Sequence, residues 1–268
     1  MEIIAFVNQK GGVGKTTSCL NVGAALRLHE GQHVLLVDAD PQGNLTASAG
    51  IDLNDADVTL LEVLKGSADI NTAIKTKAAT YGATEYPYDI IPADIMLSGV
   101  DIELSAEPGR EFILKECFSK LEKTYDYILI DCPPALSLTT VMALTAADKA
   151  IIPVQAHFLA LNGVALLYDT IQRIKRRLNP QLEVGGVILT MYDPRKILNR
   201  EVYDSLTRTF PGQIFDTTVS NSIALAEAPS TGKDIFEYKP LSKAADQYAE
   251  IAHEIKERGG INGAAHDE

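Results

Sequence analysis

A glycine-rich stretch at residues 9–17, which reads QKGGVGKTT, has the residue types and spacing of a phosphate-binding loop. Glycines let successive backbone N–H groups curl around phosphate oxygens, and a helix starting there would aim its positive N-terminus at the same anion. Lys15 would then neutralise the β- and γ-phosphates of a nucleotide, and the Thr16 hydroxyl would bind Mg²⁺. The stretch therefore predicts a nucleotide site formed by Gly11, Gly12, Val13, Gly14, Lys15, Thr16 and Thr17.

The stretch departs from the usual G-x-x-x-x-G-K-[ST] spacing at its first position, where Gln9 stands in place of glycine and Lys10 follows. A lysine before the glycines points along the nucleotide rather than beneath it. On the residues alone, Lys10 is either a second nucleotide-binding cation or a solvated surface lysine.

The elements that must position this stretch can be predicted from the hydrophobic pattern. Continuous Ile, Val and Leu runs, typical of parallel strands covered on both faces, alternate with segments of helical period. Strands are expected at residues 3–7, 34–37, 88–91, 127–130, 150–154 and 186–190, and helices at 15–29, 110–122, 138–147, 163–178, 198–210 and 242–258. This alternation predicts an α/β fold: a doubly wound, mostly parallel sheet flanked by helices.

No composition break or internal repeat divides the chain, so we expect one domain over residues 1–258. Residues 52–87 are less periodic and are expected to carry insertions over the sheet edge. The Gly/Ala-rich, polar segment 259–268 is expected to be a frayed, disordered tail.

Composition excludes several classes of protein. The chain has 268 residues, of which 46% are hydrophobic, and its three cysteines lack CxxC spacing. An odd number of cysteines without CxxC spacing argues against a disulfide framework or a zinc ribbon and fits a reducing cytosol. We expect a cytoplasmic chain without a membrane span, because no apolar run approaches roughly 18–20 residues. A net charge of −12 means that any DNA contact needs a local basic face.

Carboxylates follow two expected strands at their carboxyl ends, where α/β folds gather ligands. Asp131 ends the run 127–130, a position where a carboxylate meets Mg²⁺, usually through water, or else caps the following turn. Asp38 and Asp40 follow the run 34–37. They are also compatible with a hydrogen-bonded turn, because Asp-Pro-Gln-Gly is turn chemistry.

An ordered set of motifs makes the chain resemble the deviant Walker-A ATPases and, within them, the ParA/Soj partition family. The motifs are KGGVGKTT at 10–17, VDADPQGN at 37–44, IPAD at 91–94, DIEL at 101–104, YDYILIDCPP at 125–134, PVQ at 153–155, LTMYD at 189–193 and EAPS at 227–230. The resemblance extends from residue 3 to about residue 254.

The resemblance implies an ATPase with slow intrinsic turnover that uses ATP and Mg²⁺. It implies a homodimer that sandwiches ATP, with Lys10 of one protomer reaching the phosphates bound by the other; cations between two triphosphates relieve their repulsion. By similarity, Lys10, Lys15 and Asp40 are catalytic, and Asp40 positions the attacking water. Thr16, Asp40 and Asp131 are the implied Mg²⁺ ligands.

The family also implies adenine contacts at Met191 and Pro229, although packing residues would look the same. It implies nonspecific binding to double-stranded nucleoid DNA in the ATP state, and hydrolysis stimulated by a ParB-like partner. The DNA candidates by similarity are Arg195, Lys196 and Arg200.

Other basic residues leave the DNA-binding interpretation open. Four basic residues lie at the end of the helix predicted at 163–178: Arg173, Lys175, Arg176 and Arg177. Cations at a helix C-terminus interact favourably with the helix dipole, so these residues need not bind DNA. The family usually reads PRNVRLSEAPS before its EAPS motif, and here Asn221 and Ala224 stand where arginines are common. DNA binding is therefore expected to be weaker, moved to other lysines, or absent.

Rival functions fit less well. A MinD-like membrane ATPase needs an amphipathic final helix, which the sequence GGINGAAHDE does not provide. A nitrogenase-reductase-like carrier needs two cysteines per protomer for a shared Fe–S cluster, and neither Cys117 nor Cys132 stands in such a loop. The remaining alternative is the same ATPase cycle used to position a protein cargo rather than a centromere.

Overall fold

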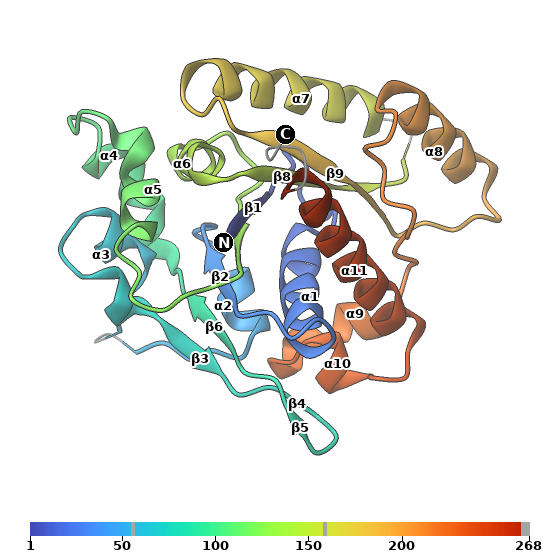
Figure 1. The fold of residues 1–268 in the computed structure, drawn as a ribbon, viewed down its shortest axis with the longest axis horizontal. Coiled ribbons are helices and arrows are strands. Elements are labelled where there is room, and N and C mark those ends of the chain that lie inside the picture. The colour runs from blue at the N-terminus through green and yellow to red at the C-terminus, as the bar shows by residue number, and fades with distance from the viewer. Residues whose placement is uncertain (55–56, 158–159, 264–268) are drawn as a thin grey trace.

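A seven-stranded sheet forms the centre of the computed structural model, which describes residues 1–54, 57–157 and 160–263. In spatial order the strands are β3 (Lys75–Lys77), β6 (Tyr88–Ile91), β2 (Val34–Asp38), β7 (Tyr127–Asp131), β1 (Glu2–Phe6), β8 (Lys149–Gln155) and β9 (Glu183–Thr190). All neighbours pair in parallel except β3, which runs antiparallel to β6 (Figure 1). The predicted α/β fold with a mostly parallel, doubly wound sheet is confirmed.

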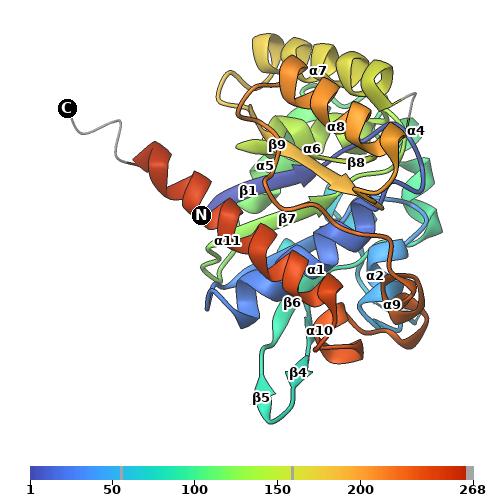
Figure 2. The same ribbon diagram turned by 90° about the vertical axis from the view of Figure 1, so that its right-hand side faces the viewer.

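Helices cover both faces of the sheet because alternate residues of each central strand point to opposite sides. In β1, Ile4 and Phe6 pack into one core, and Ile3 and Ala5 pack into the other. The first core is covered by α1 (Lys15–Leu28), α2 (Asn44–Ser48), α9 (Ile223–Glu227), α10 (Ile235–Tyr238) and α11 (Lys243–Gly263). The second is covered by α3 (Leu60–Leu64), α4 (Val100–Glu103), α5 (Ile113–Phe118), α6 (Leu138–Ala146), α7 (Ala160–Arg177) and α8 (Ile197–Thr209) (Figure 2).

The edge insertion expected at residues 52–87 is present. It contains α3, the antiparallel edge strand β3, and a small hairpin of β4 (Thr80–Tyr81) and β5 (Thr84–Glu85). Short 3-10 turns lie at Ile70–Ala73, Ile95–Gly99, Arg110–Phe112 and Ala228–Thr231. These pieces are too short to show a hydrophobic period, so the sequence pattern did not predict them individually.

Two predicted helix boundaries were wrong. The helix expected at 110–122 is a 3-10 turn followed by α5, which ends at Phe118. Beyond that end, the Asn71 side chain donates to the Lys120 carbonyl and accepts from the Glu122 N–H, so these backbone groups pair outside a helix.

The last helix continues past its predicted end at Arg258 to Gly263. A β-carbon at Gly259 would lie 3.1 Å from a carboxylate oxygen of Glu2, which shows that this turn packs against the start of β1. Residues 264–268 of the expected tail lie outside the described residues. Within the described part of the chain, no helix combines the length and apolarity needed to cross a membrane.

Candidate nucleotide-binding site

The glycine-rich stretch forms the connection between β1 and α1, as its sequence predicts. Strand β1 ends at Phe6 and α1 begins at Lys15, with Gly14 as its N-cap. Gly12 (φ +71°) and Gly14 (φ +86°) adopt the left-handed conformation, which costs other residues roughly 1–2 kcal/mol. The loop therefore depends on glycine at these two positions, and it ends at the positive N-terminus of α1.

Two residues that sequence reasoning missed hold the loop in place. The Asn8 side chain donates to the Pro153 carbonyl (2.7 Å) and accepts from the Lys10 N–H (3.0 Å). The Thr190 hydroxyl donates to the Val13 carbonyl (2.8 Å) at the other end of the loop. Pro153 and Thr190 lie in β8 and β9, far along the chain. They stand within the family motifs at 153–155 and 189–193, but nothing in those motifs indicates a contact with this loop.

Three predicted site residues meet behind the loop. Parallel registry places Asp131 beside Phe6 on one side and Asp38 on the other, so the carboxyl ends of β1, β2 and β7 coincide. The Thr16 hydroxyl donates to Asp131 Oδ2 at 2.6 Å. Lys15 is also buried, and its Nζ donates to the Lys10 carbonyl at 3.4 Å.

The electrostatics of this cluster favour a bound cation. Asp131 is fully buried, and its Oδ1 has no hydrogen-bond partner. Burial, followed by repulsion from Asp38, raises the pKa of Asp131 well above its usual value. Burial likewise lowers the pKa of Lys15, against the attraction of Asp131, Cys132 and Asp40. An unpartnered carboxylate oxygen in the interior is costly, and a hard divalent cation would offset that cost.

A magnesium ion would fit this donor set only together with a nucleotide. Thr16 and Asp131 supply oxygen ligands, the type that Mg²⁺ prefers. Among the residues that the structure describes, no group of three or more His, Cys, Asp or Glu side chains is arranged to hold a metal. The remaining ligands would therefore be phosphate oxygens and water, as is usual for this ion.

Asp38 and Asp40 both organise the turn after β2. Asp38 is completely buried and accepts from the Thr46 N–H (2.8 Å), the Thr46 hydroxyl (2.7 Å) and the Asp40 N–H (3.2 Å). Burial raises the pKa of Asp38 to about 6. Asp40 accepts from the Gln42 N–H at 3.0 Å and lies close enough to act on the Lys15 ammonium. Asp38 is thus held in a structural turn, and Asp40 stands at the edge of the phosphate loop.

A pocket of about 140 Å³ adjoins the phosphate loop and contains one of the two predicted adenine contacts. It is lined by Gly14, Thr17, Thr190, Met191, Val219, Ser220, Asn221, Ser222, Leu225, Ala226 and Tyr248. Met191 has a φ of +51°, an unusual conformation for a residue other than glycine. Pro229 does not line this pocket, because it lies beyond α9 in the 3-10 turn Ala228–Thr231, and Leu225 and Ala226 line the pocket instead.

The predicted DNA-contacting residues lie together at the start of α8. All three side chains are exposed, and Arg195 forms two hydrogen bonds to Asp193 at 2.9 and 3.0 Å. That pairing lowers the pKa of Asp193 to about 2, so part of the charge on Arg195 is already matched. Arg200 donates to the Pro194 carbonyl at 3.4 Å.

The two departures from the family's arginine pattern have different surroundings. Asn221 lines the pocket beside the phosphate loop. Ala224 is buried, with 6% of its surface exposed, so an arginine in its place would require the surrounding structure to move.

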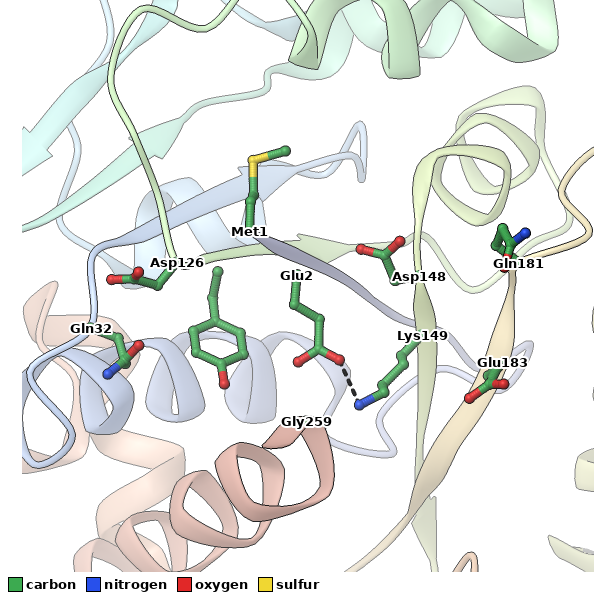
Figure 3. A pocket seen from close by; sticks show the side chains of 10 residues that line it. Met1, Glu2, Gln32, Asp126, Asp148, Lys149, Gln181, Glu183 and Gly259 are labelled. Carbon is green, nitrogen blue, oxygen red and sulfur yellow. Dashed lines mark ion pairs between the residues drawn. The ribbon is translucent and has the colours of Figure 1, made fainter. Parts of the chain in front are cut away.

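A larger cavity, of about 660 Å³, lies at the opposite end of the strands from the phosphate loop, where β1, β8 and β9 begin (Figure 3). Its lining includes Glu2, Asp126, Asp148 and Glu183, and its Lys149 is paired with Glu2. Such an acidic lining repels a triphosphate. Size alone therefore does not make this cavity the nucleotide site.

Comparison with known proteins agrees with the site's geometry. The sequence matches the AAA domain family over residues 1–184. It is 42% identical to the sporulation initiation inhibitor protein Soj of Bacillus subtilis, covering 96% of this chain and 99% of Soj. It is 41% identical to the chromosome partitioning protein ParA of Caulobacter vibrioides, covering 96% and 95%.

Among solved structures, cobyrinic acid a,c-diamide synthase from Mycobacterium smegmatis with bound ADP and magnesium superimposes with a TM-score of 0.83. It has 33% sequence identity to this protein, and the match covers 98% of this chain and 96% of the other. Soj and ParA, at 42% and 41% identity, are more similar to this chain in sequence than the synthase is. The chain belongs to the Soj/ParA family of chromosome-partitioning P-loop ATPases.

Proposed function

We propose that this protein is a partitioning ATPase that binds ATP with Mg²⁺, dimerises around the nucleotide, binds DNA without sequence preference in that state, and releases it after hydrolysis. A ParB-like partner stimulates the hydrolysis, and the dimer acts on the nucleoid in the cytoplasm. The observation that carries the proposal is the hydrogen bond from Thr16 to the buried Asp131 behind the phosphate loop, with Asp131 Oδ1 unpartnered.

Each site residue has a distinct part in that cycle. Lys15 neutralises phosphate charge, and the backbone N–H groups of the loop hold the phosphate oxygens. Thr16 and Asp131 hold Mg²⁺, which supplies positive charge to the β- and γ-phosphates. Asp40 orients the attacking water. Phosphoryl transfer needs little more from a protein than positioning and charge, so turnover without a stimulating partner is expected to be slow.

An exposed apolar surface beside the site supports dimerisation. It consists of Ile95, Met96, Ile102 and Leu136, which expose 61%, 62%, 79% and 50% of their surfaces. A cavity of about 480 Å³ is lined by Asp40 and by sequence neighbours of these apolar residues, among them Leu97 and Ala135. Large exposed apolar patches mark protein interfaces, and a dimer would cover these four side chains. Lys10 is exposed at the mouth of the phosphate loop, where it is accessible to a second protomer.

The test measures oligomeric state and DNA binding together. Size-exclusion chromatography with ATP, with ADP and without nucleotide should show a dimer with ATP alone, and Lys10→Ala should bind ATP but stay monomeric. A fully dimeric Lys10→Ala protein with ATP would refute the sandwich arrangement.

Binding to a random-sequence duplex across a salt series tests the DNA step. Each phosphate contact contributes about one to the slope of log affinity against log salt, so Arg195, Lys196 and Arg200 set a slope of at most about −3 for each protomer and about −6 for the dimer. The internal pairing of Arg195 reduces that value. ATP-driven dimers that bind no DNA in any state would support the alternative in which the cycle positions a protein cargo.

A further inference from the structure

One wall of the pocket beside the phosphate loop is a segment without regular secondary structure. Residues 218–222 belong to neither a helix nor a strand, yet Val219, Ser220, Asn221 and Ser222 all line the pocket. The position of such a segment depends on the hydrogen bonds of its own backbone, because no strand or helix ladder fixes it. The residues that supply those bonds therefore determine the shape of the pocket.

Strand β9 holds the segment from one side. The Val219 N–H donates to the Leu189 carbonyl (2.8 Å), and the Val219 carbonyl accepts from the Tyr192 N–H (2.9 Å). Both partners flank Met191, the strained residue of the same pocket. These two bonds fix Val219 but leave the backbone groups on either side of it to be paired elsewhere.

Gln247, from α11, pairs the groups on both sides of Val219. Its Oε1 accepts from the Ser220 N–H (3.1 Å) and from the Ser220 hydroxyl (3.0 Å), and its Nε2 donates to the Thr218 carbonyl (2.6 Å). Its side chain is buried, with only 8% of the residue exposed. A primary amide is suited to this place because it carries a donor and an acceptor at one end of a flexible stem.

The next residue of α11 connects the pocket to the phosphate side. Tyr248 lines the pocket, and its hydroxyl lies 3.2 Å from the hydroxyl of Ser18, in the first turn of α1. Helix α11 runs alongside α1 (Figure 2). One turn of α11 thus contacts both the wall of the pocket and the helix that begins at the phosphates.

We propose that Gln247 is a positioning residue for the base of the nucleotide: through three hydrogen bonds it holds residues 218–220 where they form the base-facing wall. The inference rests on the proposed function, since it assumes that a nucleoside triphosphate occupies the site. It predicts that Gln247 affects recognition of the base and not of the phosphates.

The test compares ATP with a ligand that lacks a base. Gln247→Met keeps the length of the side chain and removes all three bonds, and Gln247→Glu keeps the acceptor for Ser220 while losing the donor to Thr218. Asp246→Asn, at an exposed position of the same helix, is the control. Isothermal titration would measure the affinity of each variant for Mg²⁺-ATP and for Mg²⁺-tripolyphosphate.

We expect Gln247→Met to weaken ATP binding about tenfold and to change tripolyphosphate binding by less than about twofold. The loss of ATP affinity in Gln247→Glu should lie between those of the wild type and Gln247→Met. Equal losses for both ligands would mean a general structural role and would overturn the inference, as would unchanged ATP affinity. A wild-type protein that binds tripolyphosphate as tightly as ATP would also overturn it. A wild-type protein that binds neither ligand would instead contradict the proposed function.

Discussion

Asp234 gives this protein a pH-dependent stability whose size can be worked out from the structure. It is fully buried at the N-cap of α10, where Oδ1 accepts from the N–H groups of Phe236 (2.9 Å) and Glu237 (3.1 Å) and from the Tyr86 hydroxyl (2.8 Å). Oδ2 accepts from the Tyr88 hydroxyl at 3.3 Å. Burial, with a contribution from Glu237, raises the pKa of Asp234 to about 6.

A carboxyl whose pKa is raised in the folded protein favours folding only while it is protonated. The stabilisation that protonated Asp234 adds to the free energy of unfolding is complete below the unfolded pKa of about 3.9. It is lost as the pH rises through about 6. The difference between these two pKa values corresponds to roughly 3 kcal/mol between the two protonation states. At neutral pH, the ionised Asp234 therefore lowers the free energy of unfolding by about that amount relative to acid.

Asp234→Asn should remove this dependence at little structural cost. The amide oxygen can still accept the three hydrogen bonds made to Oδ1, and the amide nitrogen can donate to the Tyr88 hydroxyl. We expect the stability difference, variant minus wild type, to rise by about 3 kcal/mol between about pH 3 and pH 7.5. Urea unfolding followed by circular dichroism measures it, with the exposed Asp246→Asn as control.

A stability difference that stays constant with pH would refute the reasoning, because it would mean that the pKa of Asp234 is the same in the folded and unfolded protein. A difference that falls as the pH rises would mean that its hydrogen bonds outweigh the effect of burial.

Three further predictions concern the site and its support. Asp40→Ala should leave a stable ATP-bound dimer with little phosphate release, and wild-type turnover would contradict its assigned role. Thr190→Val keeps the side-chain shape but leaves the buried Val13 carbonyl unpaired, so urea unfolding should show a loss of about 1–3 kcal/mol, and an unchanged midpoint would argue against it. Gly232→Ala should destabilise the protein more than Gly212→Ala: both glycines have positive φ, but only at position 232 would the new β-carbon lie 2.6 Å from a backbone atom. Equal losses in urea unfolding would show that this contact relaxes.

The phosphate end of the site could be predicted because its residues are contiguous. The glycines, Lys15 and Thr16 lie within a few positions of one another between a strand and a helix, and Asp131 ends an apolar run. Parallel pairing then brings the carboxyl ends of β1, β2 and β7 to one edge of the sheet, so a local pattern and a general rule of the fold were sufficient.

The supporting residues could not be predicted because their partners are distant in the sequence. Asn8 bonds to a carbonyl 145 positions away, and Thr190 to one 177 positions away. Neither residue type is unusual where it stands, so only the folded chain shows what each one does. Pro229 illustrates a different limit: its motif matches the family, but it does not line the pocket beside the phosphate loop, so its adenine contact stays a prediction.

The two ends of the nucleotide site are therefore built in different ways, and this makes them separable. The glycine-rich loop is anchored by two adjacent strands, whereas the wall of the neighbouring pocket is held by α11, whose Tyr248 meets Ser18 across 230 positions of sequence. Substitutions in α11 can then alter the pocket without touching the phosphate loop or the Thr16–Asp131 pair. Under the proposed function, Gln247→Met is therefore expected to change nucleotide affinity while leaving the rate of the chemical step unchanged.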